Sequence, residues 1–421
     1  MSTVNTEQNI PEGWQRVKLG EFGVTLGGLS GKNKTHFGHG KSFITYMNVF
    51  SNSHLNRDMV NFVEIKEGER QNKLQYGDYL FTTSSETPKE VGMSSVVDFE
   101  PGELYLNSFC FIFRPQKDLL EPSFGGYMFR GPIFRRTIAT HAKGSTRFNL
   151  SKKDFLDVDV VFPNSKSAQK KIAEILSTVD EEIQKTDEII TATEKLKRGL
   201  MRQLFTRGIG HTKFKKSKIG EVPSAWDVAE LGSFLLQKPD YGINAPGVDY
   251  AEDLPTYIRI TDISEDGKFI SGNKKSVDHK DSSNYRLRNG DLLFARTGAS
   301  VGKTYLYKPE DGDLVFAGFL IRVCPDKSKL LPQYLSYFVQ TSIYWNWVRV
   351  MSTRSGQPGI NGNEYSGMII PVPPLSEQEE VIEVLSLFDE KISINRKLKE
   401  KLNLLKRALM QDLLSGKKRT V

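Results

Sequence analysis

Short extended runs and much longer helical runs alternate along the chain, and the same succession occurs twice. Runs that are rich in aromatic and β-branched residues and are bounded by glycine favour strands. The clearest of these runs are 42–50, 78–83, 256–263 and 291–296. In each half a helical pattern then follows a proline, at 124–140 and at 333–350. The pattern therefore predicts two α+β domains in series.

Each half ends in a long amphipathic helix, predicted at 167–206 and 376–415. Apolar residues recur there at spacings of three and four, which is typical of a helix that packs against a partner helix. The predicted stripes are Ile172, Ile175, Val179, Ile183, Ile190, Leu196, Leu200 and Leu204 in the first helix and Val381, Leu385, Phe388, Ile392, Leu402, Leu405, Leu409 and Leu413 in the second. Ser167 and Ser376 are expected as N-caps, and Glu379 would complete a capping box with Ser376.

These helices are too long to be covered by one domain each. At 1.5 Å per residue each would extend about 60 Å, more than the width of a domain of about 150 residues. The connector between the halves is short, so the second helix can run back along the first. This connectivity favours an antiparallel coiled-coil pair over the alternative, in which each helix packs separately on its own domain.

The chain is a tandem repeat with an offset of about 210 residues. The opening Pro11 and Trp14 return as Pro223 and Trp226, and further matches follow in the same order. The predicted architecture is two similar α+β domains separated by the helix pair, with an approximate two-fold axis that suits duplex DNA. The predicted divisions are residues 1–163 (first domain), 164–222 (first helix and basic connector), 223–373 (second domain) and 374–421 (second helix and basic tail).

The positive charge gathers in stretches without acidic residues. The net charge is +7, and the segments 125–153, 206–220 and 327–363 contain lysine and arginine but no aspartate or glutamate. Such stretches fit a surface that follows phosphates. Ordinary solvated lysine-rich faces explain the charge equally well, so other features must decide between the two interpretations.

The residues that would mark an enzyme or a metal protein are not found in the sequence. Two cysteines and six histidines show no metal-ligand spacing, and the segment Gly298–Thr304 is one residue short of a phosphate-binding P-loop. No activated nucleophile or acid–base pair is recognisable. The opening residues do not have the basic-then-apolar layout expected of a secretion signal, and the sequence contains no apolar run of about 18–20 residues. We therefore expect a cytoplasmic binding protein that makes no contact with a membrane and carries no catalytic residue, no metal and no cofactor.

Several loops contain the residue types that contact DNA. Hydroxyl and basic groups hold phosphates, while arginine, asparagine and glutamine read base edges. Two loops of the first domain match two loops of the second, and the glycine-rich segment 27–41 is a further candidate. The predicted DNA-binding residues are Lys32, Asn33, Lys34, Thr83, Ser84, Ser85, Lys143, Ser145, Thr146, Arg147, Asn149, Arg296, Thr297, Ser300, Thr353, Arg354, Ser355, Gln357 and Asn361.

Taken in order, these features resemble the specificity subunits of type I restriction-modification enzymes. Both repeats open with Pro-x-x-Trp-x-x-x-x-Leu-Gly and contain a Gly-Asp-hydrophobic-hydrophobic-Phe strand. The second helix begins with Pro-Leu-Ser-Glu-Gln at 374–378. The first helix departs from this pattern, because it begins with Ser167-Ala168-Gln169. The resemblance extends from Pro11 to Gly416.

The resemblance implies a non-catalytic subunit that reads an asymmetric bipartite site in double-stranded DNA, one half-site per domain. It also implies that the helices set the distance between the domains and dock two methyltransferase subunits, which use S-adenosylmethionine. Restriction (translocase) subunits would add steps that depend on ATP and Mg²⁺. Two alternatives are a stand-alone DNA-binding protein and a coiled-coil scaffold whose end domains bind other proteins.

Overall fold

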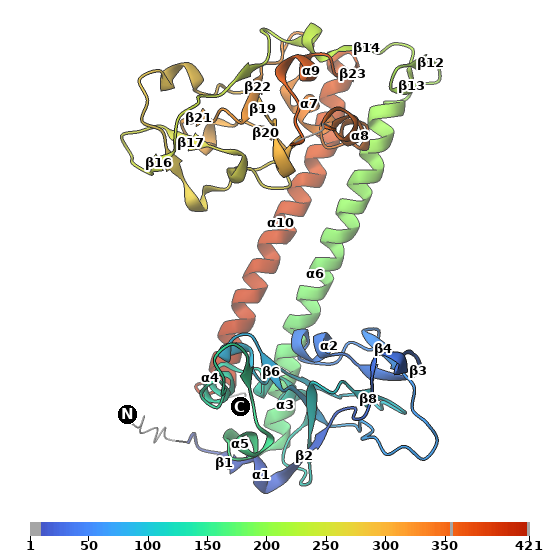
Figure 1. Cartoon of the computed structure of the whole chain (residues 1–421), viewed down its shortest axis with the longest axis vertical. Helices are drawn as coiled ribbons and strands as arrows, with labels where there is room; N and C mark the ends of the chain where they lie inside the picture. Colours follow the sequence, from blue (N-terminus) through green and yellow to red (C-terminus); the bar gives the residue numbers. More distant parts are fainter. Residues whose placement is uncertain (1–9, 354–356, 419–421) are drawn as a thin grey trace. The chain divides into compact units, whose positions relative to one another are not determined.

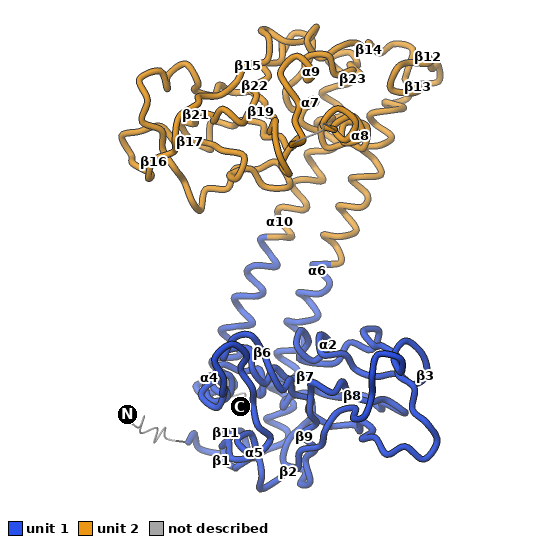
Figure 2. Tube along the Cα trace, viewed as in Figure 1, with its two compact units in different colours: residues 1–187, 397–421 blue, residues 188–396 orange. Residues whose placement is uncertain are grey.

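The computed structural model describes residues 10–353 and 357–418. The chain packs as two compact units (Figure 2). Unit 1 contains residues 1–187 and 397–421, and unit 2 contains residues 188–396. Each unit thus combines one α+β domain with one end of each long helix.

Unit 1 is built on a four-stranded sheet in the order β2-β9-β5-β7 and a three-stranded sheet in the order β4-β3-β8. Two further pairs, β1 with β11 and β6 with β10, complete it. The strands are β1 Trp14–Lys18, β2 Gly23–Gly27, β3 Phe37–Ile44, β4 Val60–Val63, β5 Tyr79–Thr82, β6 Ser84–Ser85, β7 Ser94–Val96, β8 Tyr105–Leu106, β9 Cys110–Pro115, β10 Phe148–Asn149 and β11 Asp159–Pro163. The helices are α1 Leu19–Phe22, α2 Tyr46–Ser51, α3 Pro122–Met128, α4 Pro132–Thr140, α5 Lys152–Leu156 and α6 Lys166–Arg207.

Unit 2 has a similar plan, with the sheets β15-β22-β19-β20 and β16-β18-β17-β21 and the pair β14 with β23, and it adds the pair β12 with β13. Its strands are β12 Phe214–Ser217, β13 Gly220–Pro223, β14 Asp227–Glu230, β15 Asp240–Tyr241, β16 Val248–Asp249, β17 Thr256–Ile258, β18 Lys275–Ser276, β19 Leu292–Ala295, β20 Thr304–Leu306, β21 Leu314–Phe316, β22 Leu320–Val323 and β23 Ile369–Val372. Its helices are α7 Pro332–Phe338, α8 Ser342–Met351, α9 Gly362–Ser366 and α10 Leu375–Leu413.

The four-stranded sheet of unit 1 is buried on both faces. In β5 the side chains of Tyr79 and Phe81 belong to one hydrophobic cluster, and that of Leu80 belongs to another. Successive side chains of a strand point to opposite faces, so a sheet covered on both sides needs apolar residues at every position. This explains the three consecutive apolar residues Tyr79, Leu80 and Phe81 in the segment 78–83, whose prediction as a strand is confirmed by β5.

The long helices α6 and α10 pair in antiparallel fashion (Figure 1). Ion pairs join the two helices within each unit, and the partner on α10 moves toward its N-terminus as the partner on α6 moves toward its C-terminus. These pairs are Asp180–Lys406 and Asp187–Lys399 in unit 1, both at 2.5 Å, and Glu194–Arg396 at 2.8 Å and Lys197–Asp389 at 2.6 Å in unit 2. The predicted antiparallel pair and the α+β class are therefore confirmed.

Two residues of the predicted helix stripes do not lie in the seam. Leu196 is 65% exposed and Leu405 47% exposed, and they occupy matching places in the repeat. In α6 the buried positions are instead Thr193 and Lys197, the next members of the three–four series after Ile190. The spacing located the seam, but a leucine beside the seam was taken as part of it, because a buried lysine with an ion-pair partner was not expected.

The predicted helix caps are wrong by two residues. Helix α6 begins at Lys166, and the Ser165 hydroxyl accepts a hydrogen bond from Ala168 N at 3.4 Å. Helix α10 begins at Leu375, directly after a proline, so Ser376 lies inside its first turn and forms no capping box. The acidic residue of this first turn is Glu377, which accepts a hydrogen bond from the Trp226 indole.

Four other predicted elements are interrupted. The run 124–140 forms two helices, because the residue before Pro132 is held in the extended conformation. The run 333–350 likewise forms α7 and α8, with Thr341 capping the second. The predicted strand 42–50 turns into α2, capped by the Thr45 hydroxyl. The predicted strand 256–263 ends at Ile258, where side-chain hydrogen bonds to backbone favour a turn.

Among the described residues, no helix is both long enough and apolar enough to cross a bilayer.

Candidate DNA interface

In unit 1 the two predicted DNA-contacting loops lie side by side. Strand β6 pairs with β10 in antiparallel register, with Ser84 opposite Asn149. Leu150 N donates to Thr83 O at 2.9 Å, and Lys143 and Asn149 exchange backbone hydrogen bonds of 2.8 and 2.9 Å. The segment after β5 and the loop before α5, far apart in sequence, therefore form one surface.

Exposure divides these predicted residues into two groups. Ser84 and Ser85 are buried and serve the pairing of the strands. Five residues are exposed on the loop tip: Lys143, Ser145, Thr146, Arg147 and Asn149. The Lys143 ammonium forms an ion pair with Asp154 at 2.7 Å, and its hydrogen bond lowers the pKa of that carboxyl. Hydroxyl and basic groups thus dominate the exposed part of the surface.

Unit 2 brings the matching loops together in the same way. Ile360 N donates to Arg296 O at 2.9 Å, and Gly298 N donates to Pro358 O at 3.0 Å. Thr297 forms an isolated bridge with Gly359. Three predicted residues are exposed on the facing loop, namely Thr353, Gln357 and Asn361. Arg354 and Ser355 lie outside the described residues.

Arg296 is held in a fixed place within this surface. Its guanidinium carbon lies 4.8 Å from the centre of the Tyr241 ring. The Tyr241 hydroxyl in turn accepts a hydrogen bond from Gly362 N at 3.0 Å. A guanidinium over an aromatic face keeps its charge while its plane is oriented. Tyr241 was not predicted as a site residue, because no sequence pattern links it to a loop some fifty residues away.

The third predicted segment is largely engaged within the protein. The Lys32 ammonium forms an ion pair with Glu69 at 2.6 Å and donates to Glu64 O at 2.5 Å. The hydrogen bond from Lys32 lowers the pKa of Glu69 to about 2. The Asn33 side chain caps a short helical turn, while Lys34 is exposed. Lys34 is therefore the exposed lysine among the three residues predicted in this segment.

A buried glutamine fastens each domain to the helix that follows it. Gln169 and Gln378 occupy matching positions in the first turns of α6 and α10, and both are fully buried. Gln169 accepts a hydrogen bond from Glu121 N at 2.7 Å and donates to Leu119 O and Pro163 O. Gln378 makes the same three bonds with Leu331 N, Lys329 O and Pro373 O. Both glutamines lie in the helix starts of the sequence pattern, but their role was not predicted.

A tyrosine, an aspartate and a lysine form a second anchor in each unit. In unit 1 the Tyr127 hydroxyl donates to Asp180 at 2.9 Å, and Asp180 pairs with Lys406. In unit 2 the triad is Tyr337, Asp389 and Lys197, with a donor distance of 2.8 Å. The tyrosine comes from the domain, the aspartate from its own helix and the lysine from the other helix. Each triad therefore joins one domain to both helices.

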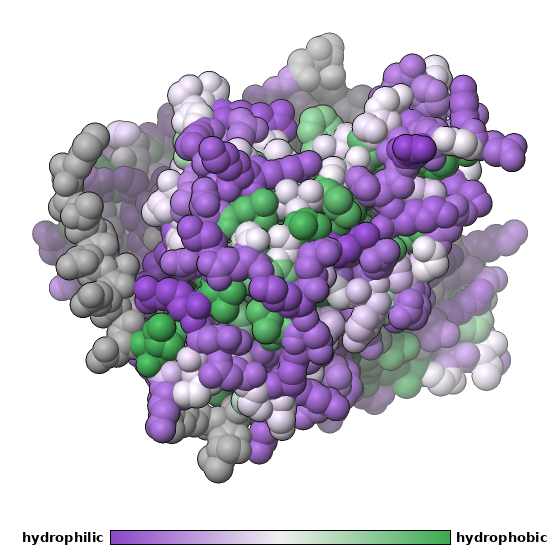
Figure 3. Space-filling view, turned by 90° about the horizontal axis from the view of Figure 1, so that it is seen from below, coloured by the Kyte–Doolittle hydropathy of each residue, from purple (hydrophilic) through white to green (hydrophobic). Residues whose placement is uncertain are grey.

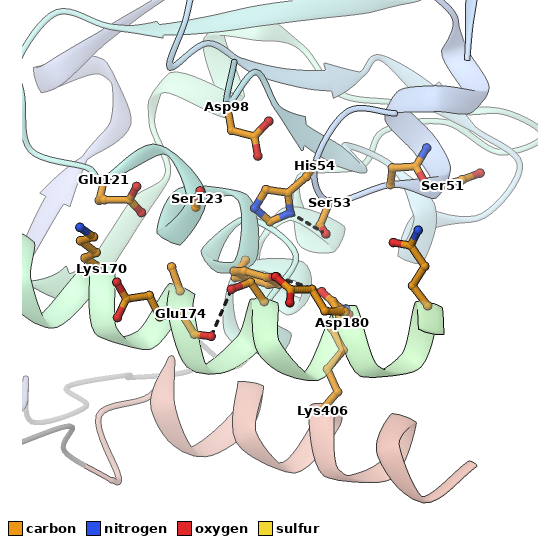
Figure 4. A pocket seen from close by; sticks show the side chains of 16 residues that line it. Ser51, Ser53, His54, Asp98, Glu121, Ser123, Lys170, Glu174, Asp180 and Lys406 are labelled. Carbon is orange, nitrogen blue, oxygen red and sulfur yellow. Dashed lines mark hydrogen bonds and ion pairs between the residues drawn. The ribbon is translucent and has the colours of Figure 1, made fainter. Parts of the chain in front are cut away.

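The unit 1 triad borders a cavity of about 570 Å³ (Figure 4). His54 lies above helix α6 there, its ring centre 4.8 Å from that of Tyr127, and its Nδ1 lies 3.1 Å from the Ser53 hydroxyl. Burial lowers the pKa of His54, although Asp98 and Asp180 act in the opposite direction. Within the described residues, no three histidine, cysteine or acidic side chains are arranged to hold a metal ion.

Figure 3 shows the face seen from below in Figure 1, which is mostly hydrophilic, with hydrophobic residues in small separate patches.

Comparison with known families identifies both repeats. The model described as the type I restriction modification DNA specificity domain matches residues 11–194 and again residues 223–404. The chain belongs to this family. It is a specificity subunit of a type I restriction-modification system, a DNA-recognition component and not a catalytic one.

Relatives agree with this identification over nearly the whole chain. A protein of Methanocaldococcus jannaschii assigned as the specificity subunit of type I restriction enzyme MjaX is 28% identical, covering 97% of this chain and 94% of that protein. The StySPI specificity subunit of Salmonella potsdam is 23% identical and covers 89% and 81%. The crystal structure of the S subunit from M. genitalium superposes with a TM-score of 0.57 at 14% identity, covering 98% of both chains. This last likeness shows that the fold is shared.

Proposed function

We propose that each unit of this specificity subunit reads one half of an asymmetric bipartite site in double-stranded DNA. The recognition domains in this proposal are residues 1–163 and 223–373, and residues 164–222 and 374–421 supply the helix pair and its basic extensions. The candidate contacts are Lys34, Thr83, Lys143, Ser145, Thr146, Arg147 and Asn149 in unit 1, and Arg296, Thr297, Ser300, Thr353, Arg354, Ser355, Gln357 and Asn361 in unit 2. Such a protein works in the cytoplasm, where the DNA is.

One observation carries this proposal. In both units, two loops that are distant in sequence meet through equivalent backbone hydrogen bonds, Leu150 to Thr83 and Ile360 to Arg296. The surface so formed exposes hydroxyl, amide and basic groups, the types that bind phosphates and base edges. Because the loops differ between the units, the two half-sites should differ in sequence.

The helix pair is the proposed docking surface for two methyltransferase subunits, one in each unit. Ile189 and Leu196 on α6 are 43% and 65% exposed. Leu398 and Leu405, at the matching places on α10, are 44% and 47% exposed. Exposed apolar residues seven apart lie on one face of a helix and favour a protein partner. The methyltransferase subunits would bring S-adenosylmethionine, and restriction subunits would bring ATP and Mg²⁺.

Substitution of Arg147 tests the interface. We expect Arg147→Ala to weaken binding by about 1–3 kcal/mol and to relax specificity only in the half-site read by unit 1 if the arginine contacts a base. A uniform loss with a shallower salt dependence would identify a phosphate contact. Lys117→Ala is the matched control, because Lys117 is also exposed but follows the far end of β9. Unchanged affinity of the Arg147 variant on every duplex would count against the proposed surface.

A further inference from the structure

Each unit exposes one phenylalanine beside the proposed DNA interface. Phe109 is 60% exposed and Phe319 is 57% exposed. They are separated by the offset of the repeat, so they occupy the same place in the two domains. Neither side chain belongs to a hydrophobic cluster of its unit. Core packing therefore does not explain why both domains have a large apolar side chain here.

Both phenylalanines stand third in a tight turn. Cys110 N donates to Asn107 O at 3.1 Å in unit 1, and Leu320 N donates to Ala317 O at 2.8 Å in unit 2. The turns differ in sequence, Asn-Ser-Phe-Cys and Ala-Gly-Phe-Leu, and share only the phenylalanine. Because turns usually carry small or polar residues, an exposed aromatic at the same turn position in both domains points to a contact outside the chain.

The turn is bonded directly to the proposed DNA-contacting segment. Thr83 N donates to Phe109 O at 2.9 Å, and Arg296 N donates to Phe319 O at 3.1 Å. The carbonyl groups of Thr83 and Arg296 in turn accept the hydrogen bonds from Leu150 N and Ile360 N. Each phenylalanine is therefore joined by a main-chain hydrogen bond to a residue that is proposed to bind DNA, Thr83 in unit 1 and Arg296 in unit 2.

A glycine keeps the turn in this position in both units. A Cβ atom on Gly28 would lie 2.1 Å from the carbonyl oxygen of Asn107, and one on Gly242 would lie 2.2 Å from that of Ala317. Both distances are too short for any side chain. The backbone directly after β2 and after β15 thus packs closely against the turn in both domains, while the phenylalanine side chain is exposed.

We infer that Phe109 and Phe319 are apolar wedges, each of which enters a base step of its half-site and partly unstacks it. This inference rests on the proposed function. A phenyl ring offers no hydrogen bond to a base edge, whereas its face stacks on any base. The two units have different loops and the same phenylalanine, so it serves a task common to both half-sites. Opening a base step with an inserted apolar side chain is such a task.

The test uses the chain assembled with its methyltransferase subunits and a duplex that carries its site, mapped from methylated adenines. Phe109→Ala should bind the intact duplex on the order of tenfold more weakly, because stacking and insertion are lost. A single mismatch placed at the wedged step should restore most of that loss, because the step is already unstacked. Phe319→Ala should behave likewise, with its rescuing mismatch in the other half-site. Phe109→Leu should retain most of the affinity.

Tyr76→Ala is the matched control, because Tyr76 is 53% exposed and precedes β5, whereas Thr83 follows the end of that strand. It should bind like the unaltered chain. The wedge is overturned if the phenylalanine variants bind the intact duplex normally, if no mismatch restores them, or if replacing thymine by uracil reproduces the loss, which would indicate a methyl contact. Normal binding by both Phe109→Ala and Arg147→Ala would overturn the proposed interface itself, whereas a loss in Arg147→Ala alone would leave the interface standing without the wedge.

Discussion

The two units hold their domains with the same anchors, but unit 2 has an additional buried cluster at its helix start. Glu377 accepts hydrogen bonds from Trp226 Nε1 at 2.8 Å and Ile209 N at 3.0 Å, and His211 Nε2 lies 2.9 Å from the same carboxylate. The position of Glu377 in the repeat is occupied in unit 1 by Ala168. Trp226 is fully buried, whereas its counterpart Trp14 is only half-buried.

A second difference lies where the domains meet the middle of the helices. In unit 2 Asp266 forms an ion pair with Arg396 at 3.1 Å, and Arg396 also pairs with Glu194. The loop near His54 in unit 1 and the loop of Asp266 in unit 2 each border a cavity beside the triad, so the difference lies in the ion pair and not in the cavity. The comparison teaches that the repeated glutamine and triad fix how a domain is attached, while residues outside the repeat adjust how firmly it is held.

The largest difference in local stability between the units is expected when the buried carboxylate of Glu377 in unit 2 is removed. Glu377→Ala should leave the buried Trp226 indole N–H and the partly buried Ile209 N–H without their acceptor, and the buried donor should cost about 1–3 kcal/mol. Hydrogen exchange measured by mass spectrometry should show faster exchange at the start of α10 and around Trp226, with unit 1 unchanged. Glu379→Ala, two residues along the same helix and exposed, is the control. If the two variants exchange alike, the cluster does not distinguish the units.

Much of this attachment was foreseeable from the sequence, and the part that was not has a physical reason. The repeat and the apolar stripe predicted the domains, the long helices and their antiparallel pairing, because periodic burial shows itself in the residue pattern. The meeting of loops 83–85 with 143–149 was not predicted, since hydrogen bonds between distant segments leave no local signal. The triads were missed for the same reason, although Tyr127 and Tyr337 occupy matching positions in the repeat.

At the helix caps and the short elements, a local residue pattern was present but predicted the wrong structure. A serine near a helix start suggested an N-cap, but the chain begins each helix earlier, and the carboxylate of Glu377 is drawn to a tryptophan 151 positions away in sequence. The exposed Phe109 and Phe319 occupy matching positions in the repeat, but an apolar residue inside a strand-like run is predicted to be buried. Only the turn that precedes β9 and β22 reveals that they face outward.

Substitution of the triad tyrosines is expected to lower stability moderately and by the same amount in the two units. Tyr127→Phe and Tyr337→Phe each remove one hydrogen bond to a carboxylate and keep the ring, which should cost about 1 kcal/mol. Hydrogen exchange should rise around α3 in the first variant and around α7 in the second, each within its own unit. Tyr76→Phe is the control on an exposed tyrosine. An effect in one unit only would show that the triads are not equivalent anchors.

The smallest effect on stability is expected from the Asp266–Arg396 ion pair of unit 2. Burial acts to raise the pKa of Asp266, but hydrogen bonds from Ser264 and Lys268 outweigh it, and Arg396 adds to them, so that the pKa falls to about 2. Because the group is half exposed, Asp266→Asn should lower the stability of unit 2 by only about 0.5 kcal/mol near neutral pH.

The pH dependence of that effect follows from the direction of the shift. A carboxylate whose pKa is lowered by folding stabilises the protein above its unfolded pKa of about 4, and the contribution is lost as the pH falls toward 2. The difference in unfolding free energy between the unaltered chain and Asp266→Asn should therefore be constant above about pH 5 and shrink below about pH 4. High salt should reduce it as well, since the pair is partly exposed. Chemical denaturation followed in unit 2 across this range measures the difference, and one that grows on acidification would show that Asp266 does not act through this ion pair.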